Sequence, residues 1–158
     1  MIGLRFQLDD DVLEHDAKHD PGTADPAALQ ETYFVLPTRF EVDDVDLLGA
    51  EGVTVAPWLP LPILHVARVF ADLVDGLNDE ASATYHLPGG GWQLQLKRRG
   101  TGVSVHSTVN GTSVEVSYAE LRSAADSFRK DVCSLLISRA PELAHHADWG
   151  AWVSESRR

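Results

Sequence analysis

The 158-residue chain is poor in cysteine, in basic residues and in long apolar runs. Its single cysteine, Cys133, cannot form an internal disulfide, which favours a reducing compartment. The longest apolar stretch, residues 58–74, is interrupted by prolines and charged residues, so no segment approaches the roughly 20 apolar residues of a membrane span. Residues 1–8 carry one basic residue and lead directly into three aspartates, unlike a secretory signal. We therefore expect a cytoplasmic protein without a membrane segment.

The scarcity of basic residues excludes whole classes of partner. The chain has 13 Lys and Arg against 24 Asp and Glu, and its net charge is -11. Phosphate groups of nucleic acids and anionic membranes both attract basic surfaces, so we expect neither nucleic-acid binding nor membrane docking. A basic partner matches this charge better.

The acidic residues are concentrated in the first half of the chain. Residues 1–80 contain 17 acidic and 4 basic residues, whereas residues 81–158 contain 7 and 9. Two acidic clusters, residues 9–20 and 43–51, flank a predicted strand and are expected to converge on one side of a sheet. Such a negative field speeds the encounter with a basic protein. The alternative is a surface that only keeps the protein soluble.

Hydrophobic periodicity predicts strands and helices along the whole chain. Hydrophobic residues make up 44% of it, enough for a folded core, and the length suits one domain over residues 1–158. Alternation with period two predicts strands at residues 2–8, 32–42, 52–56, 82–87, 92–97, 103–109 and 114–116. Apolar residues at helical spacing predict helices at residues 62–77 and 118–139 and a short helix in the tail, residues 141–158. Residues 9–30, rich in acidic residues and helix breakers, predict a loop with at most one or two helical turns.

These elements predict an α+β fold with the order βββαββββαα. Because neighbouring strands usually pair, we expect a single large antiparallel sheet of about seven strands, with two amphipathic helices packed on one face. Pro37 predicts an edge position or a bulge for the second strand. An alternative is a more strongly curled sheet that grips the long C-terminal helix and encloses a ligand cavity.

Two histidine pairs suggest metal binding but lack the pattern of a metal site. His15 and His19 have the spacing of the zincin motif, yet their segment has no apolar stripe, no third ligand and Asp in place of Glu. We expect a solvated acidic loop there, with adventitious binding of divalent ions as the alternative. His145 and His146 are expected at the surface beside two tryptophans that dock the tail. We predict no metal site and no cofactor.

No nucleophile, base and orienting acid share a recognisable spacing, so the sequence does not indicate an enzyme. Cys133 lies in a predicted helix, where a buried thiol is usually inert. The triple glycine at residues 89–91 lies between two strands and therefore predicts a turn rather than a phosphate cradle. Asn110-Gly111 predicts a tight hairpin.

The layout of the chain resembles a group of bacterial proteins. The strand "TYFVLPTRFEV", the helix "PWLPLPILHVARVFADLVDGL", a strand meander, the helix "SYAELRSAADSFRKDVCSLL" and the tail "WGAW" are similar to small actinobacterial proteins grouped with the immunity proteins of polymorphic toxin systems. The resemblance covers most of the chain and concerns layout and not a diagnostic motif. It implies an acidic cytoplasmic α+β protein that neutralises a cognate toxin by direct binding. It assigns no functional residue.

The leading hypothesis is a non-enzymatic acidic binding protein, an immunity-type inhibitor of a basic toxin. Its predicted contacts are acidic residues that follow the second strand, with two exposed aromatic residues as apolar anchors: Asp43, Asp44, Asp46, Tyr33 and Trp58. A small-molecule-binding domain or small enzyme is the second hypothesis, with a cavity between sheet and helix lined by Trp92, Leu94 and Phe128. The third is an acidic secretion-type chaperone, which requires a dimer with exposed apolar grooves. A homo-oligomer is compatible with the sequence.

Overall fold

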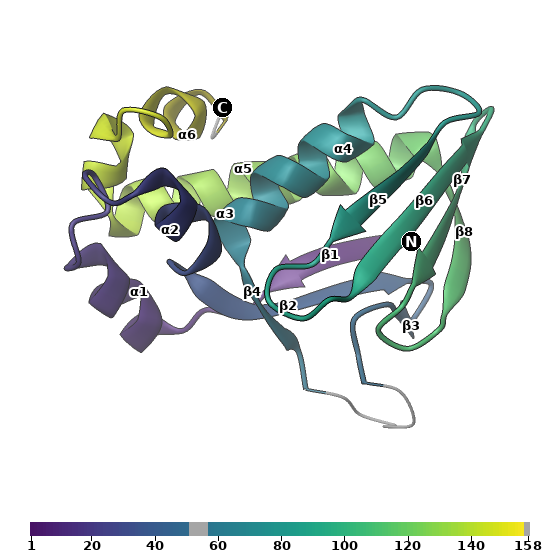
Figure 1. Ribbon diagram of the computed structural model, residues 1–158, viewed down its shortest axis with the longest axis horizontal. Coiled ribbons are helices and arrows are strands. Elements are labelled where there is room, and N and C mark those ends of the chain that lie inside the picture. The colour runs from purple at the N-terminus through teal and green to yellow at the C-terminus, as the bar shows by residue number, and fades with distance from the viewer. Residues whose placement is uncertain (51–56, 157–158) are drawn as a thin grey trace.

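The computed structural model describes residues 1–50 and 57–156 and shows an α+β fold built on two antiparallel sheets (Figure 1). The strands are β1 (Ile2–Phe6), β2 (Val35–Val42), β3 (Val45–Asp46), β4 (Leu59–Pro62), β5 (Ser82–His86), β6 (Gln93–Arg99), β7 (Gly102–Ser107) and β8 (Ser113–Ser117). The helices are α1 (Asp10–Ala17), α2 (Pro26–Glu31), α3 (Ile63–His65), the π-helical turn η1 (Val66–Phe70), α4 (Ala71–Asp75), α5 (Tyr118–Arg139), the 3₁₀-helix η2 (Pro141–His145) and α6 (Gly150–Ser156). The predicted strand at residues 52–56 lies outside the described residues.

Strand β2 is the centre of the first sheet, which we call sheet A. Strand β1 pairs with β2 along one edge, while β4 and β3 pair with the start and the end of its other edge. Side chains of β2 alternate as predicted, and Phe34, just before the strand, and Leu36, Phe40 and Val42 in it face the core. The prediction that Pro37 marks an edge position or a bulge is wrong, because β2 pairs on both sides in continuous register.

Three prolines are accommodated in sheet A because none is required to donate a hydrogen bond there. Pro37 accepts from the Gln7 amide at 2.8 Å, just beyond the last residue of β1, where its missing N–H costs no bond within the strand. In β4, Pro60 and Pro62 are opposite Pro37 and Val35. The alternation of an antiparallel ladder directs the Val35 N–H and the carbonyls of Val35 and Pro37 toward β1, so Pro60 and Pro62 occupy non-bonded pairs. A segment that is predicted to lead into a helix therefore forms a strand.

The second sheet, sheet B, is the predicted meander, β5-β6-β7-β8. Its strand positions and its turns at residues 88–91, 100–101 and 110–111 agree with the sequence prediction. Gly111 has a φ of 72°, which explains the glycine in the β7–β8 turn. The meander does not join sheet A, so the single sheet of about seven strands is a wrong prediction.

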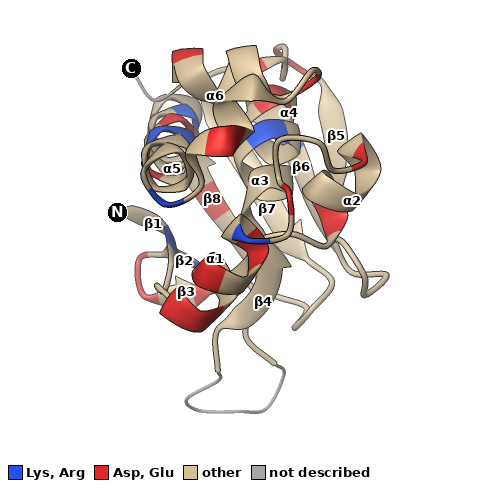
Figure 2. Ribbon diagram, turned by 90° about the vertical axis from the view of Figure 1, so that its left-hand side faces the viewer, with Lys and Arg blue, Asp and Glu red and all other residues tan. Residues whose placement is uncertain are grey.

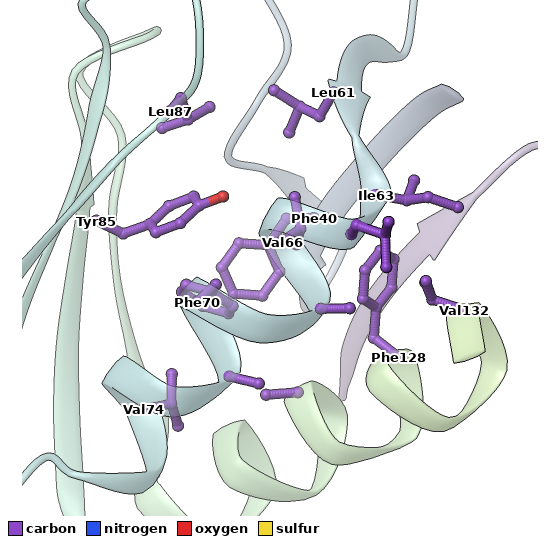
Figure 3. Close-up of a cluster of buried hydrophobic side chains, with 14 of the residues drawn as sticks. Phe40, Leu61, Ile63, Val66, Phe70, Val74, Tyr85, Leu87, Phe128 and Val132 are labelled. Atoms are coloured by element: carbon purple, nitrogen blue, oxygen red, sulfur yellow. The ribbon is translucent and has the colours of Figure 1, made fainter. Parts of the chain in front are cut away.

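A buried helix formed by α3, η1 and α4, which we call the central helix, separates the two sheets. The predicted stripe of Ile63, Ala67, Phe70 and Val74 is buried, as is Leu77 just after the helix. The Phe70 ring lies 5.9 Å from that of Phe40 in sheet A and 5.1 Å from that of Tyr85 in sheet B (Figure 3). Since this helix needs apolar neighbours on several sides, the sheets pack around it instead of extending one another.

The long helix α5 covers the inner side of β1 and packs against the central helix (Figure 1). It begins as predicted, because the Ser117 hydroxyl accepts a hydrogen bond from the Glu120 amide at 3.0 Å. Phe128 packs edge-to-face on Phe6, with ring centroids 5.7 Å apart. These contacts fix β1 relative to the helix layer.

The acidic segment at residues 9–30 contains two helices and is not mainly the loop that was predicted. Asp9 caps α1 by accepting from the Val12 amide at 3.2 Å, and Asp25 caps α2 just before Pro26. Each short helix buries one leucine completely, Leu13 and Leu29. One buried leucine per helix is too little periodicity to be recognised in the sequence.

The tail folds back onto the core through Trp149, which is buried as predicted. The prediction of a surface position is wrong for His146, which is 5% exposed. Its Nε2 lies 2.7 Å from the Ala24 carbonyl, and its Nδ1 accepts from the amides of Asp148 and Trp149. His146 therefore connects the tail to the segment between α1 and α2. Within the described residues, no helix has the length and apolarity to cross a bilayer.

Candidate partner-binding surface

Sheet A turns one face to the helices and the other outward. The β2 side chains that face outward include Arg39 and Glu41, which alternate with the buried Thr38, Phe40 and Val42. Acidic residues are prominent on α1 and on the turn that joins β2 to β3 (Figure 2). The outward face of sheet A and this turn form the candidate surface.

Trp58 lies beside two arginines of this face. The guanidinium carbon of Arg5 is 5.6 Å from the centre of its ring, and that of Arg39 is 5.7 Å away. Arg39 and Arg5 are opposite each other in the β1–β2 register. Stacking on an aromatic ring holds a guanidinium in place. We call Arg5, Arg39, Glu41, Asp46 and Trp58 the Trp58 cluster.

The carboxylates of the Trp58 cluster surround Arg39. Its Nε lies 2.5 Å from Glu41 Oε1 and 3.7 Å from Asp46 Oδ2, and the three side chains are 27%, 20% and 19% exposed. The Nε–H does not point at the Glu41 oxygen, so the contact is an ion pair without a well-aligned hydrogen bond. Arg5, 3.4 Å from Glu41 and largely exposed, adds little stability. Both carboxylates are thus already paired with Arg39 and mostly shielded from solvent.

The turn between β2 and β3 presents Asp43 and Asp44 to solvent. The two residues have φ values of 47° and 69° and connect Val42 directly to its partner Val45, which is the geometry of a type I′ hairpin turn. Aspartate tolerates this left-handed conformation better than most residues. Asp43 forms an ion pair with the amino group of Met1, and Val45 is 38% exposed beside the two carboxylates. We call residues 43–46 the acidic hairpin.

Sheet B holds the acidic hairpin in position. The Asn110 side chain donates to the carbonyls of Asp46 and Gly49, and the Ser107 hydroxyl donates to that of Leu47. Asp46 Oδ1 accepts from the Leu48 amide at 3.0 Å, which closes a tight turn. Leu47 and Leu48 are buried beneath this segment. The hairpin is therefore a rigid acidic feature.

Four of the five predicted contact residues lie together on this surface. Asp43, Asp44 and Asp46 form the hairpin, and Arg39 links Asp46 to Trp58. Tyr33 does not join them. It precedes β2 at the other end of sheet A, where its hydroxyl donates to the His19 carbonyl at 2.5 Å.

The two acidic clusters also do not converge. Asp16 in α1 accepts from the Phe34 amide at the start of β2, whereas the acidic hairpin follows the end of that strand (Figure 1). Eight residues of strand, at ~3.4 Å each, separate them by roughly 25 Å. The charge of the first half therefore forms two separate acidic regions.

Sequence reasoning missed the residues that organise the site. Arg39 and Glu41 were placed on the polar face of their strand, but their contacts with Trp58 and Arg5 depend on β1 and β4 flanking β2. Asn110 was recognised only as a turn residue. Its hydrogen bonds to residues 46 and 49 had no signal in the sequence, because they join different sheets.

The other reactive side chains are distant or shielded. In residues 1–50 and 57–156, no group of three or more His, Cys, Asp or Glu is arranged to hold a metal ion. The rings of His15 and His19 stack at 4.0 Å, and His19 Nδ1 bonds to the His15 carbonyl. Cys133 is buried, and this burial raises the pKa of its thiol to about 12, so it is a poor nucleophile.

The interior between the sheets is tightly filled. A void of about 10 Å³ lies among Phe40, Tyr85, Leu94 and their neighbours, which is about the room for one water molecule. Trp92 is 40% exposed in a turn, and Phe128 packs on Phe6. The three residues predicted to line a ligand cavity do not share one.

Comparisons of the chain with protein-family models, with curated proteins and with solved structures gave no match.

Proposed function

We propose that this chain is a non-enzymatic protein that binds a basic protein partner through the acidic hairpin and the Trp58 cluster, in the manner of an immunity-type inhibitor of a toxin. The observation that carries the proposal is that Asp43, Asp44, Asp46 and Trp58 occupy one surface, where hydrogen bonds from Asn110 fix the backbone at Asp46 and Gly49. Tryptophan is enriched among the residues that dominate the binding energy of protein interfaces, and exposed carboxylates favour the approach of a basic partner.

The charge of this surface supports a basic partner. Glu41, Asp43, Asp44 and Asp46 supply four carboxylates against three cationic groups, the guanidinium groups of Arg5 and Arg39 and the amino group of Met1. Asp43 and Asp44 are exposed, so a cation can approach them without displacing core residues. The second acidic region on α1 adds to a long-range negative field that accelerates association. The residues predicted to line a ligand cavity, Trp92, Leu94 and Phe128, do not share one, so they give no comparable support to the small-molecule alternative.

The experiment compares the wild type with the variant Asp43→Asn/Asp44→Asn/Asp46→Asn. Asparagine accepts the left-handed turn conformation and keeps a side-chain oxygen for the Leu48 amide, so charge is removed while the fold is retained. A matched control, Asp11→Asn/Glu14→Gln/Asp20→Asn, removes the same three charges from the α1 region. Tagged proteins are used to capture partners from the source cells, and the dissociation constant of each captured protein is then measured by calorimetry.

The expected result is a basic partner whose affinity falls at least about tenfold with the hairpin variant and much less with the control variant. The affinity should also fall between about 50 mM and about 500 mM NaCl, because salt screens exposed charges. For an immunity-type inhibitor, expression of the captured partner alone should arrest growth, and co-expression of the wild type should restore it. Equal affinities of the wild type and the hairpin variant would contradict the proposal.

A further inference from the structure

One edge of sheet A is formed by β1, and its backbone groups are open to an additional strand. Met1 and Gln7 bond to Asp43 and Pro37 across the β1–β2 pair. Bonded and non-bonded pairs alternate in an antiparallel ladder, so Gly3 and Arg5 also bond to β2. The N–H and C=O groups of Ile2, Leu4 and Phe6 therefore point away from the sheet. No described residue outside β1 bonds to these groups.

A groove runs between this open edge and the first half of α5. It has a volume of about 450 Å³ and is bordered by residues 1–5 on one side. On the other side it is bordered by Glu120, Ser123, Ala124 and Ser127. Three of these four helix residues are small, which leaves room beside the strand. Adjacent strands lie about 4.8 Å apart, and an extended peptide seated at that spacing would lie between β1 and α5.

We infer that an extended, basic segment of the partner adds to β1 as an antiparallel strand and lies in the groove against α5. This inference rests on the proposed function and specifies how the partner binds. Strand addition beside a helix is a recurring mode of peptide recognition, in which backbone hydrogen bonds supply affinity and neighbouring side chains supply specificity. Here the bonds would come from Ile2, Leu4 and Phe6.

The charges around the groove select a basic segment over a second copy of this chain. The charged groups that line the groove are Glu120, Arg5 and the Met1 amino group, and the acidic hairpin lies beside Met1 at that end of β1. Asp9 to Asp11 follow the other end of the strand. Antiparallel pairing of two β1 strands centred on Leu4 would bring Asp43 of one copy close to Asp9 of the other. Like charges oppose that arrangement, whereas lysine or arginine residues near both ends of a peptide would be attracted.

The test uses a phage-displayed library of random peptides, selected on the wild-type chain. The blocking variant is Ser123→Leu/Ser127→Leu, which fills the groove from two exposed positions on α5. Its matched control is Ser134→Leu/Ser138→Leu, which makes the same changes at exposed positions of α5 that do not line the groove. Leucine is a better helix former than serine, so both variants should fold, and circular dichroism checks this.

Peptides that support the inference are basic and rich in strand-forming residues, and they bind the blocking variant at least about tenfold more weakly than the control variant. Amide hydrogen exchange gives a second readout. Bound peptide should slow exchange at Ile2, Leu4 and Phe6 and leave Gly3 and Arg5 unchanged, because the latter already bond to β2. This alternating pattern is expected only for strand addition.

The inference is overturned if no peptide is enriched, if enriched peptides bind the blocking and control variants equally, or if sedimentation shows a dimer that the blocking variant abolishes. Failure here is distinct from failure of the proposed function. If peptides or the captured partner lose affinity with the Asp43→Asn/Asp44→Asn/Asp46→Asn variant but not with the blocking variant, the acidic surface binds a basic partner by another route. In that case the proposed function stands and strand addition is excluded.

Discussion

The side-chain amide of Asn110 donates a hydrogen bond to the backbone carbonyl of Asp46 at 2.8 Å, across 64 residues of sequence. The same amide donates to the carbonyl of Gly49 at 3.0 Å, and the Asn110 oxygen accepts from the Thr112 amide. One turn residue of sheet B thus fixes both its own hairpin and the segment that carries the acidic hairpin of sheet A. The geometry of the proposed binding surface depends on a residue outside it.

Replacement of Asn110 by aspartate should loosen the acidic hairpin. Asn110→Asp keeps an acceptor for Thr112 but removes both donors and places a negative charge against two carbonyl oxygens. We expect a loss of about 1–3 kcal/mol in the free energy of unfolding, measured by urea denaturation. Hydrogen exchange at residues 45–48 should become faster than in the wild type. Asn78→Asp, an exposed position, is the control, and equal destabilisation by both changes would contradict this role for Asn110.

The conformation of the acidic hairpin predicts an unusual order of substitutions at Asp44, whose φ is 69°. Asp44→Ala should destabilise the protein by about 1 kcal/mol, because a β-carbon is strained in the left-handed region. Asp44→Gly and Asp44→Asn should leave stability unchanged or raise it slightly. Thermal unfolding monitored by circular dichroism tests this order. If alanine proves as stable as glycine, the turn is not type I′ in solution.

Local patterns were sufficient to predict much of the fold. The meander of sheet B, the buried stripe of the central helix and the start of α5 each depend on residues close together in sequence, and each was predicted. Strand β4 was missed because its prolines resemble a helix start. Its strand pairing depends on β2 placing the non-bonded positions opposite Pro60 and Pro62.

The arrangement of the sheets and of the site was not predictable in the same way. Whether strands of sheet A pair with β5 to form one sheet depends on where the central helix packs. Phe70 of this helix lies between Phe40 of sheet A and Tyr85 of sheet B, so the two sheets stay separate. The carboxylates of the site were identified from charge density alone. The contact of Asp46 with Arg39 follows from the pairing of β3 with β2, and the separation of Tyr33 from the carboxylates follows from the distance between the two ends of β2.

Cys133 provides a test of the packing beneath α5. The thiol is fully buried, and this burial raises its pKa to about 12. Ellman's reagent should therefore react very slowly with the native protein at pH 8 and rapidly with protein unfolded in guanidinium chloride. The native rate should increase in parallel with the unfolded fraction as urea is added. Rapid reaction of the native protein would show that the helix opens locally and that the core is looser than described.

The contact between His65 and Tyr85 makes stability depend on pH in a specified direction. Nδ1 of His65 lies 2.8 Å from the Tyr85 hydroxyl, and burial lowers the pKa of this histidine below its usual 6.5, although Glu31 acts weakly in the opposite direction. The unfolded chain therefore takes up a proton at higher pH than the folded chain does. Because stability rises with pH wherever the unfolded state binds more protons, the contribution of His65 is complete above about pH 7 and is lost as the pH falls through 6.5.

The variant His65→Gln isolates this contribution, since glutamine can bond to Tyr85 and does not titrate. Urea denaturation at pH 7.5 and at pH 5.5 should show that the wild type loses more of its free energy of unfolding on acidification than His65→Gln does. His106→Gln, at a histidine on the outer face of sheet B, controls for the loss of any one histidine. A wild type and a His65→Gln variant with the same pH dependence would mean that His65 is hydrated in the folded protein. The Tyr85 hydroxyl would then need another partner to satisfy it in the core.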